Sequence, residues 1–121
     1  MPDGESTTIE LREPIQCVLW EHPERTSGKF AELFEKVETY EDSSHSTRVL
    51  YKCRECGQLY FFEWWEWVDW EDGNDTQYST LFPVGTVQES ETLKKTSSFE
   101  LMRYYPRLHV AGASSAWVGK G

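Results

Sequence analysis

The stretch Val49–Trp70, VLYKCRECGQLYFFEWWEWVDW, decides the fold of this chain. It begins as an apolar, β-prone run, passes through the corner Cys53–Gly57 (CRECG) and continues as the densest aromatic segment of the sequence. A Cys-x-x-Cys-Gly corner between two β-prone arms is typical of a zinc knuckle, a tight turn that offers two thiolates to one metal ion. We therefore expect a β-hairpin with a metal-binding turn at its tip.

A structural zinc ion needs four ligands, usually thiolates and imidazoles, in a closed tetrahedron. The knuckle cysteines, Cys53 and Cys56, supply two, and Gly57 suits the left-handed backbone that turns amides toward the sulfur atoms. Cys17 is the remaining thiol, and His22 is the imidazole nearest to it in the sequence. We therefore expect a structural zinc ion with the following ligands: Cys17, His22, Cys53 and Cys56.

Two alternatives to this ligand set stay open. If His22 points away from the thiols, His45 or His109 supplies the imidazole. If no metal binds, the knuckle cysteines are reduced surface thiols and Cys17 is a small core residue.

The composition indicates one domain with an aromatic core. At 121 residues the chain is most simply a single domain. Hydrophobic residues make up only 38% of it, but six Trp, six Tyr and six Phe are many for this length. Residues 1–8 are small, polar and acidic, so we expect a disordered tail followed by one zinc-ribbon-like α+β domain over residues 9–121.

The cysteine count indicates a reducing compartment. Three cysteines, two of them in one Cys-x-x-Cys, suit a metal site better than a secreted disulfide framework. The N-terminal residues MPDGESTTIE contain no basic segment followed by an apolar run, so no signal peptide is predicted. No apolar run approaches the ~20 residues that a membrane span needs. We expect a cytoplasmic protein without a membrane partner.

The segments before the hairpin are ambiguous. Residues 15–20 (IQCVLW) form a short β-prone run. In residues 29–40 (KFAELFEKVETY) the apolar residues match helical spacing, which favours a helix. The expected hairpin loop at residues 41–46 and the β-prone run after it favour a strand instead. We favour the strand slightly.

Beyond the knuckle, aromatic residues occupy both faces of the expected strand, whereas a strand with one solvated face has polar residues there. Either both sides of the sheet are covered, or a β-bulge near Glu66 re-aims the side chains, or an aromatic patch is exposed. Residues 78–84 (YSTLFPV) predict another strand of a second hairpin, and residues 116–118 (AWV) predict a last edge strand.

Two capping signatures predict short helices after these strands. Thr86 with Glu89, and Ser97 with Glu100, have the Ser/Thr-x-x-Glu spacing of a capping box. We expect one or two short helices between about residues 88 and 105. The predicted fold class is therefore α+β: an antiparallel β-sheet with a zinc-knuckle hairpin and one or two short C-terminal helices.

The charge pattern favours a basic protein partner. The net charge is -9, and no Lys or Arg occurs from Glu55 to Leu93. Such charge repels nucleic acid and anionic membranes. The plain interpretation is a solvated acidic face; the sharper one is an acidic surface with aromatic anchors, as protein interfaces use. The residues expected to bind a partner are Trp64, Trp65, Trp67, Asp69, Trp70, Glu71, Asp72 and Asp75.

The sequence contains no Gly-rich phosphate loop, no His-Glu-x-x-His helix and no nucleophile elbow, so we expect a protein that is not an enzyme. Two other function classes remain. A zinc-ribbon nucleic-acid-binding or regulatory protein is favoured by the knuckle and opposed by the missing basic patch. A small zinc enzyme would require an open coordination position at the metal.

The sequence from Cys53 to Val84, CRECGQLYFFEWWEWVDWEDGNDTQYSTLFPV, resembles a group of small bacterial proteins. They share a Cys-x-x-Cys-Gly-x-x-Tyr corner, an aromatic and acidic strand, and a Tyr-containing strand that ends in Pro-Val. Residues 104–108 (YYPRL) and 117–120 (WVGK) are also similar to that group. The resemblance implies zinc-ribbon character for the knuckle cysteines. A full ribbon would have a second Cys-x-x-Cys where this chain has Cys17-x4-His22.

Acidic proteins of this size are also typical of immunity proteins that pair with bacterial nuclease toxins, which is an analogy of class alone. We therefore expect a non-enzymatic acidic protein-binding domain. Its expected role is that of an immunity or antitoxin-like inhibitor that covers the basic surface of a toxin.

Overall fold

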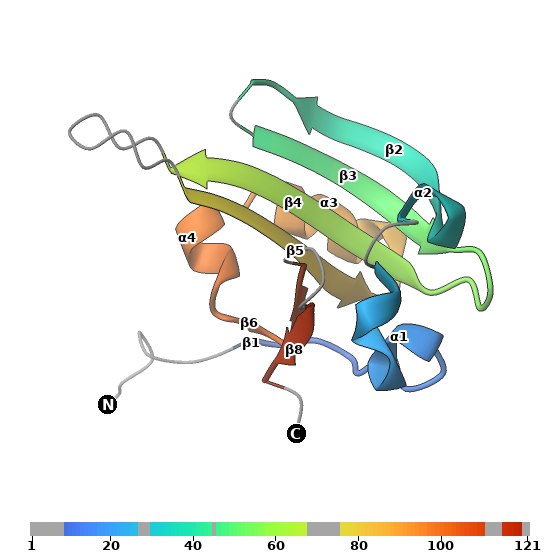
Figure 1. The fold of residues 1–121 in the computed structure, drawn as a ribbon. Coiled ribbons are helices and arrows are strands. Elements are labelled where there is room, and N and C mark those ends of the chain that lie inside the picture. The colour runs from blue at the N-terminus through green and yellow to red at the C-terminus, as the bar shows by residue number, and fades with distance from the viewer. Residues whose placement is uncertain (1–8, 27–29, 45, 68–75, 111–114, 120–121) are drawn as a thin grey trace, which may run out of the picture.

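The computed structural model describes residues 9–26, 30–44, 46–67, 76–110 and 115–119, so the expected tail at residues 1–8 lies outside it. The main element is a six-stranded sheet in which neighbouring strands are antiparallel (Figure 1). In sheet order, the strands are β2 (Phe34–Asp42), β3 (Ser46–Cys53), β4 (Leu59–Trp67), β5 (Thr76–Val84), β7 (Arg107–His109) and β8 (Ala116–Val118). A separate parallel pair joins β1 (Ile9–Glu10) to β6 (Tyr104–Tyr105).

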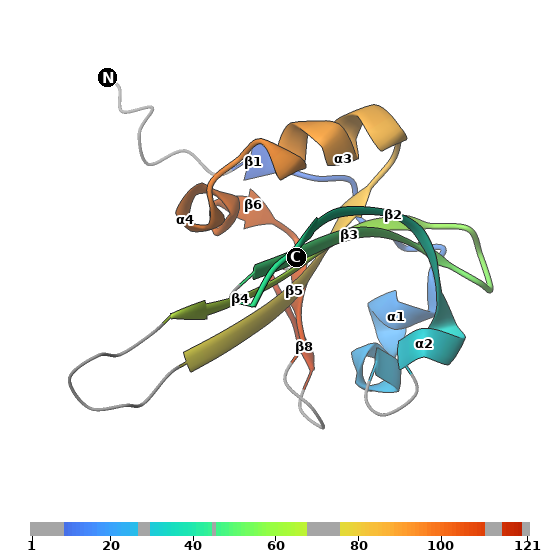
Figure 2. The same ribbon diagram turned by 90° about the horizontal axis from the view of Figure 1, so that it is seen from above.

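Short helices lie on both sides of the sheet (Figure 2). On one side are α1 (Val18–Glu21), the 3-10 turn η2 (Pro23–Thr26) and α2 (Phe30–Leu33). On the other side are α3 (Val87–Lys94) and α4 (Ser98–Leu101), which connect β5 to the C-terminal strands. In the part of the chain that the structure describes, no helix is long and apolar enough to cross a membrane.

Strand β4 is buried on both faces, which explains its two-sided aromatic pattern. Phe61 packs on the α3 and α4 side in a cluster with Leu50, Phe82, Val84, Leu93 and Leu101. Tyr60 packs on the opposite side in a cluster with Cys17, Leu19, Leu33, Phe34, Cys53, Leu81 and Leu108. The β4–β5 pairing runs through Glu66 and the β3–β4 pairing ends at Trp65, both without a register shift. The described strands therefore contain no β-bulge near Glu66, which was the second of the three alternatives. Of the three explanations, coverage of both faces is correct.

The α+β class and its main elements are confirmed. Strands β3 and β4 form the predicted hairpin, β5 pairs with β4 as its second partner, and β8 is the predicted edge strand. Both capping signatures hold as well. The Thr86 hydroxyl accepts the amide of Glu89 and the Ser97 hydroxyl accepts the amide of Glu100, each at 3.2 Å.

The β-prone run at residues 15–20 does not form a strand, because α1 begins at Val18. Leu19 and Trp20 are consecutive and both buried, which a strand with one covered face cannot achieve. The Trp20 ring packs edge-on against Trp117 of β8 at 4.9 Å between ring centroids. Packing against the end of the chain therefore overrides the local β propensity.

Both interpretations of residues 29–40 hold for part of the segment. The chain makes one helical turn in α2 and becomes strand β2 at Phe34. Two register shifts in the pairing of β2 with β3 disturb the strand alternation, and they leave Val37 exposed. The helical spacing of apolar residues was thus misleading beyond Leu33. The expected helix up to residue 105 also ends earlier, at Leu101, because Tyr104–Tyr105 pairs with β1.

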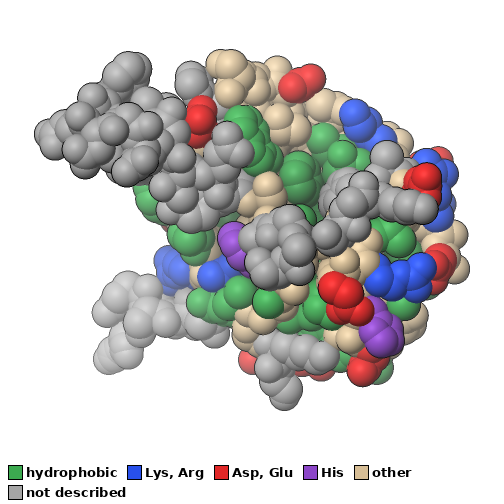
Figure 3. Space-filling view, in the orientation of Figure 1, with side chains coloured by type: hydrophobic (Ala, Val, Ile, Leu, Met, Phe, Trp, Pro, Cys, Tyr) green, Lys and Arg blue, Asp and Glu red, His purple; other side chains and the backbone are tan. Residues whose placement is uncertain are grey.

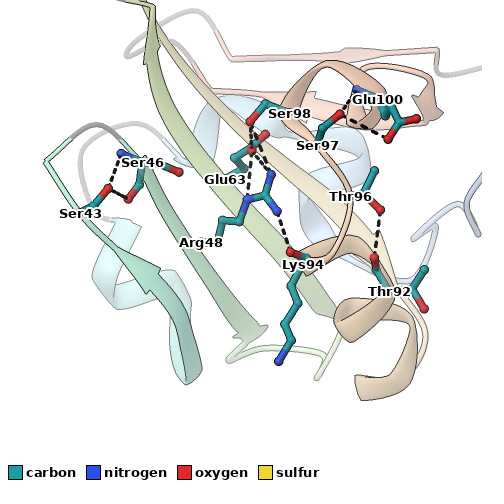
Figure 4. A network of polar contacts seen from close by, with 10 residues as sticks. All are labelled: Ser43, Ser46, Arg48, Glu63, Thr92, Lys94, Thr96, Ser97, Ser98 and Glu100. Atoms are coloured by element: carbon teal, nitrogen blue, oxygen red, sulfur yellow. Dashed lines mark hydrogen bonds and ion pairs between the residues drawn. The ribbon is translucent and has the colours of Figure 1, made fainter.

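A buried ion pair joins the sheet to the helices on the α3 and α4 side (Figure 4). Arg48 of β3 donates to the Glu63 carboxylate of β4 from Nη2 at 2.7 Å and from Nε at 3.2 Å. Arg48 Nη1 donates to the carbonyl of Lys94 at 2.9 Å, and the Ser98 hydroxyl donates to the same Glu63 oxygen at 2.6 Å. Arg48 is 8% exposed and Glu63 is 2% exposed, so the pair lies within the fold.

Replacement of Arg48 by Met should lower the free energy of unfolding by about 3–5 kcal/mol, because the buried Glu63 carboxylate loses its cation. A matched control is Arg25→Met, which removes an exposed ion pair with Glu55 at 3.2 Å and should cost at most about 1 kcal/mol. Urea denaturation measures both values. Equal losses for the two variants would show that the buried pair does not constrain the fold.

Candidate metal centre

The structure brings the three cysteines of the chain together. The sulfur atoms of Cys17, Cys53 and Cys56 all lie within 4.8 Å of one another, and none is in a disulfide. Zinc–sulfur bonds of ~2.3 Å place tetrahedral ligand sulfurs about 3.8 Å apart. The observed separation is therefore compatible with three thiolate ligands of one metal ion.

A tight turn after β3 presents the two knuckle cysteines. The amide of Gly57 donates to the carbonyl of Cys53 at 2.9 Å, and the amide of Cys53 donates to the carbonyl of Gln58 at 2.8 Å. Gly57 has a φ of 83°, which favours glycine, although a Cβ at this position would meet no atom within 4 Å. Backbone conformation, and not space, therefore accounts for glycine at the turn.

Cys17 reaches the turn from a distant segment. It precedes α1, where its amide donates to the carbonyl of Pro14 at 2.9 Å and its carbonyl accepts the amide of Trp20 at 3.0 Å. The side chain of Gln16 donates to the side-chain oxygen of Gln58, which holds this segment beside the knuckle. The third sulfur is thus positioned by contacts between segments about 40 residues apart in the sequence.

The surroundings of the thiols differ in burial. Cys17 is 2% exposed and Cys53 is 1% exposed, whereas Cys56 is exposed. Burial raises the pKa of the Cys17 thiol to about 12, and the Tyr60 hydroxyl and the Leu19 backbone amide act in the opposite direction. Partial burial also raises the pKa of Cys56, and the backbone amide of Gln58 acts in the opposite direction. A metal ion would have to displace protons from these thiols in order to bind.

His22 does not join the thiols, which corrects the predicted fourth ligand. The ligand atoms that meet within 4.8 Å are the three sulfurs alone, as far as the described side chains extend. The His22 ring is exposed, and its Nδ1 lies 3.2 Å from the Glu24 carboxylate. The single turn of α1 separates His22 from Cys17 and carries the ring away from the knuckle. Of the alternatives, His109 lies on β7 and His45 lies outside the described residues.

The residues predicted to bind a partner are only partly described. Trp64 and Trp65 are half-buried and, as consecutive residues of β4, lie on opposite faces of the sheet. The two indoles therefore do not form one anchor surface. Trp67 ends β4, and its side chain is not described. The remaining predicted residues lie outside the described residues: Asp69, Trp70, Glu71, Asp72 and Asp75.

Sequence reasoning missed Tyr60 as a residue of this site. Tyr60 is 0% exposed, and its hydroxyl interacts electrostatically with all three thiols. Burial raises the pKa of Tyr60 far above its ordinary value. The tyrosine of the Cys-x-x-Cys-Gly-x-x-Tyr corner was the signal that could have identified it.

Comparison of the chain with protein-family models, with curated protein sequences and with solved structures found no match. The interpretation of the site therefore depends on the geometry of its own residues.

Substitution of Ser for Cys17, Cys53 or Cys56 should each abolish tight zinc binding, because the site then retains only two thiolates. His22→Ala should bind zinc as tightly as the unaltered protein, since the His22 ring lies outside the cluster. Zinc content after competition with a chromophoric chelator measures both effects. Loss of zinc from His22→Ala would return His22 to the ligand set.

Proposed function

We propose that this protein is a non-enzymatic protein-binding domain that is held together by a structural zinc ion. The observation that carries the proposal is the cluster of three reduced sulfur atoms within 4.8 Å, two of them in the core. Thiolates at this spacing are the ligands that zinc prefers in structural sites. Cys17 and Cys53 are buried, which leaves little access for a substrate to their side of the metal and favours a structural role over a catalytic one.

The zinc ion would fasten the N-terminal segment to the tip of the β3–β4 hairpin. The chain from Cys17 to α2 covers one face of the sheet with short helices, none longer than four residues in its described part. Helices of this length have little intrinsic stability in water, so they depend on tertiary contacts. A metal bond between Cys17 and the knuckle would supply such a contact, and the free energy of metal binding would become folding free energy.

The partner in this proposal is a basic protein surface, and a toxin domain is the class that the analogy to immunity proteins suggests. The outer strand β2 supports a basic partner, because four of its acidic side chains are exposed: Glu35, Glu38, Glu41 and Asp42. The same strand also carries the exposed Lys36, so its charge is mixed but mostly acidic. Charged side chains on an outer strand also hinder edge-to-edge association of the sheet. The acidic run at residues 69–75, after β4 in the sequence, adds to the charge in this proposal.

A second group of side chains could contribute apolar contact area. Phe99 of α4 is 60% exposed, and its ring packs edge-on against Trp65 at 5.6 Å between centroids. Met102, just after α4, is exposed as well. Aromatic and Met side chains are enriched at the centres of protein interfaces. On the face in Figure 3, basic and acidic side chains lie together among hydrophobic ones.

Removal of zinc should destabilise the protein. At a free zinc concentration of 100 times the dissociation constant, the metal adds about 2.7 kcal/mol to the free energy of unfolding. Thermal unfolding with zinc and after dialysis against a chelator measures the difference, and the Cys56→Ser variant is the control that should not respond. Equal midpoints with and without zinc in the unaltered protein would contradict a structural metal.

Neutralisation of the acidic run should weaken binding to a basic partner. The variant Asp69→Asn, Glu71→Gln, Asp72→Asn and Asp75→Asn loses four negative charges, so association should slow and its salt dependence should become shallower. The partner is first isolated by co-purification, and stopped-flow kinetics at several salt concentrations then measures the rate. A matched control replaces Glu24, Glu32, Glu10 and Glu13, which are exposed and lie away from this run in the sequence. An identical response of both variants would contradict a localised acidic surface.

A further inference from the structure

The hydroxyl of Tyr60 is a polar group inside the core without an ordinary partner. The residue is fully buried, and its hydroxyl makes no hydrogen bond of regular geometry with any residue that the structure describes. Most buried polar side-chain atoms have a hydrogen-bond partner, because a missing one leaves the cost of desolvation uncompensated. The position of this hydroxyl therefore calls for an explanation.

The Tyr60 side chain is aimed into the cluster of thiols. Tyr60 lies opposite Tyr51 in the β3–β4 pairing, and Cys53 is two residues beyond Tyr51, so Tyr60 and Cys53 share a face of the sheet. The Phe34 ring packs edge-on against the Tyr60 ring at 5.7 Å between centroids and fixes its direction. Cys17 and Cys53 pack in the same buried cluster as Tyr60, so thiols surround the hydroxyl end of the ring.

We propose that the Tyr60 hydroxyl is a preset hydrogen-bond donor to the Cys17 thiolate of the metal-bound site. The inference rests on the proposed zinc ion and names a residue that positions one of its ligands. A protonated thiol is a weak acceptor, whereas a thiolate is charged and accepts a strong hydrogen bond from a hydroxyl. Metal binding therefore provides the partner that the hydroxyl lacks.

Other donors around the sulfurs support this role. The backbone amide of Leu19 interacts with Cys17, and the backbone amide of Gln58 interacts with Cys56. Three thiolates and one Zn²⁺ carry a net charge of −1, which is costly to bury without compensating donors. Groups that hydrogen-bond to ligand atoms orient those ligands and raise metal affinity. Tyr60 would supply this contact to the most deeply buried part of the site from the sheet side.

The test compares Tyr60→Phe with a matched control, Tyr51→Phe, in the full chain. Tyr51 lies opposite Tyr60 on β3, and its ring packs against Phe34 and Phe62 at 5.7 and 5.6 Å between centroids. Zinc affinity is measured by chelator competition, cobalt coordination by absorption spectroscopy, and the stability of the metal-free proteins by urea denaturation. Tyr60→Phe should bind zinc about 10- to 100-fold more weakly than the unaltered protein. Tyr51→Phe should bind it equally well.

Four outcomes decide between explanations. The metal-free Tyr60→Phe protein should be at least as stable as the unaltered one, because the substitution removes an unsatisfied hydroxyl; a large loss of stability would indicate a purely structural role and overturn the inference. Cobalt in Tyr60→Phe should keep its tetrahedral absorption bands, and loss of these bands would make Tyr60 a ligand and not a donor. Unchanged zinc affinity would overturn the inference while leaving the metal site intact. If the unaltered protein binds no zinc, the proposed function fails together with the inference.

Discussion

Strand β4 sends alternate side chains into two separate hydrophobic clusters, so neither face of the sheet is left to water over its central part. This requirement determines what surrounds the sheet. The hydrophobic groups of α3 and α4 close the cluster around Phe61, and the segment that contains Cys17 closes the cluster around Tyr60. Both covering segments are short. Beside its apolar contacts, the segment with α3 and α4 is joined to the sheet by the Arg48–Glu63 ion pair, and the segment with Cys17 meets the sheet at the three thiols.

These two polar groups differ in how completely the protein supplies their hydrogen-bond and charge partners. On the α3 and α4 side, the Glu63 carboxylate has Arg48 and Ser98 as partners, and Arg48 also reaches a helix carbonyl. Within this network the buried charges have partners from the protein itself. On the opposite side, the thiols and the Tyr60 hydroxyl meet without forming such a closed set. The contrast supports the proposal that the thiol cluster is a site for an added cation.

The sequence predicted those parts of the fold that depend on neighbouring residues. The Cys-x-x-Cys-Gly turn, the β-hairpin around it and both capping boxes are local chemistry, and all are present in the structure apart from the metal itself. The three thiol ligands could also be named from the sequence, since the chain contains only three cysteines.

The remaining features depend on packing between distant segments. Part of the run at residues 15–20 is helical, because Trp20 packs against Trp117, almost one hundred positions later. His22 was assigned to the metal from its distance in sequence, but one turn of helix decides the direction of its ring. The corner motif contains Tyr60, but its place on the same face as Cys53 follows from the register of the hairpin.

The hydrogen bond from the Trp117 indole to the Leu19 carbonyl, at 2.7 Å across 98 residues, has a consequence for biosynthesis. Strands β2 to β5 pair with their immediate neighbours and can form while translation continues, since such contacts are local. The segment around Cys17 is synthesised before these strands, whereas β8, which anchors it, is synthesised after them. The part of N-terminal docking that depends on this hydrogen bond therefore has to wait until β8 has been made.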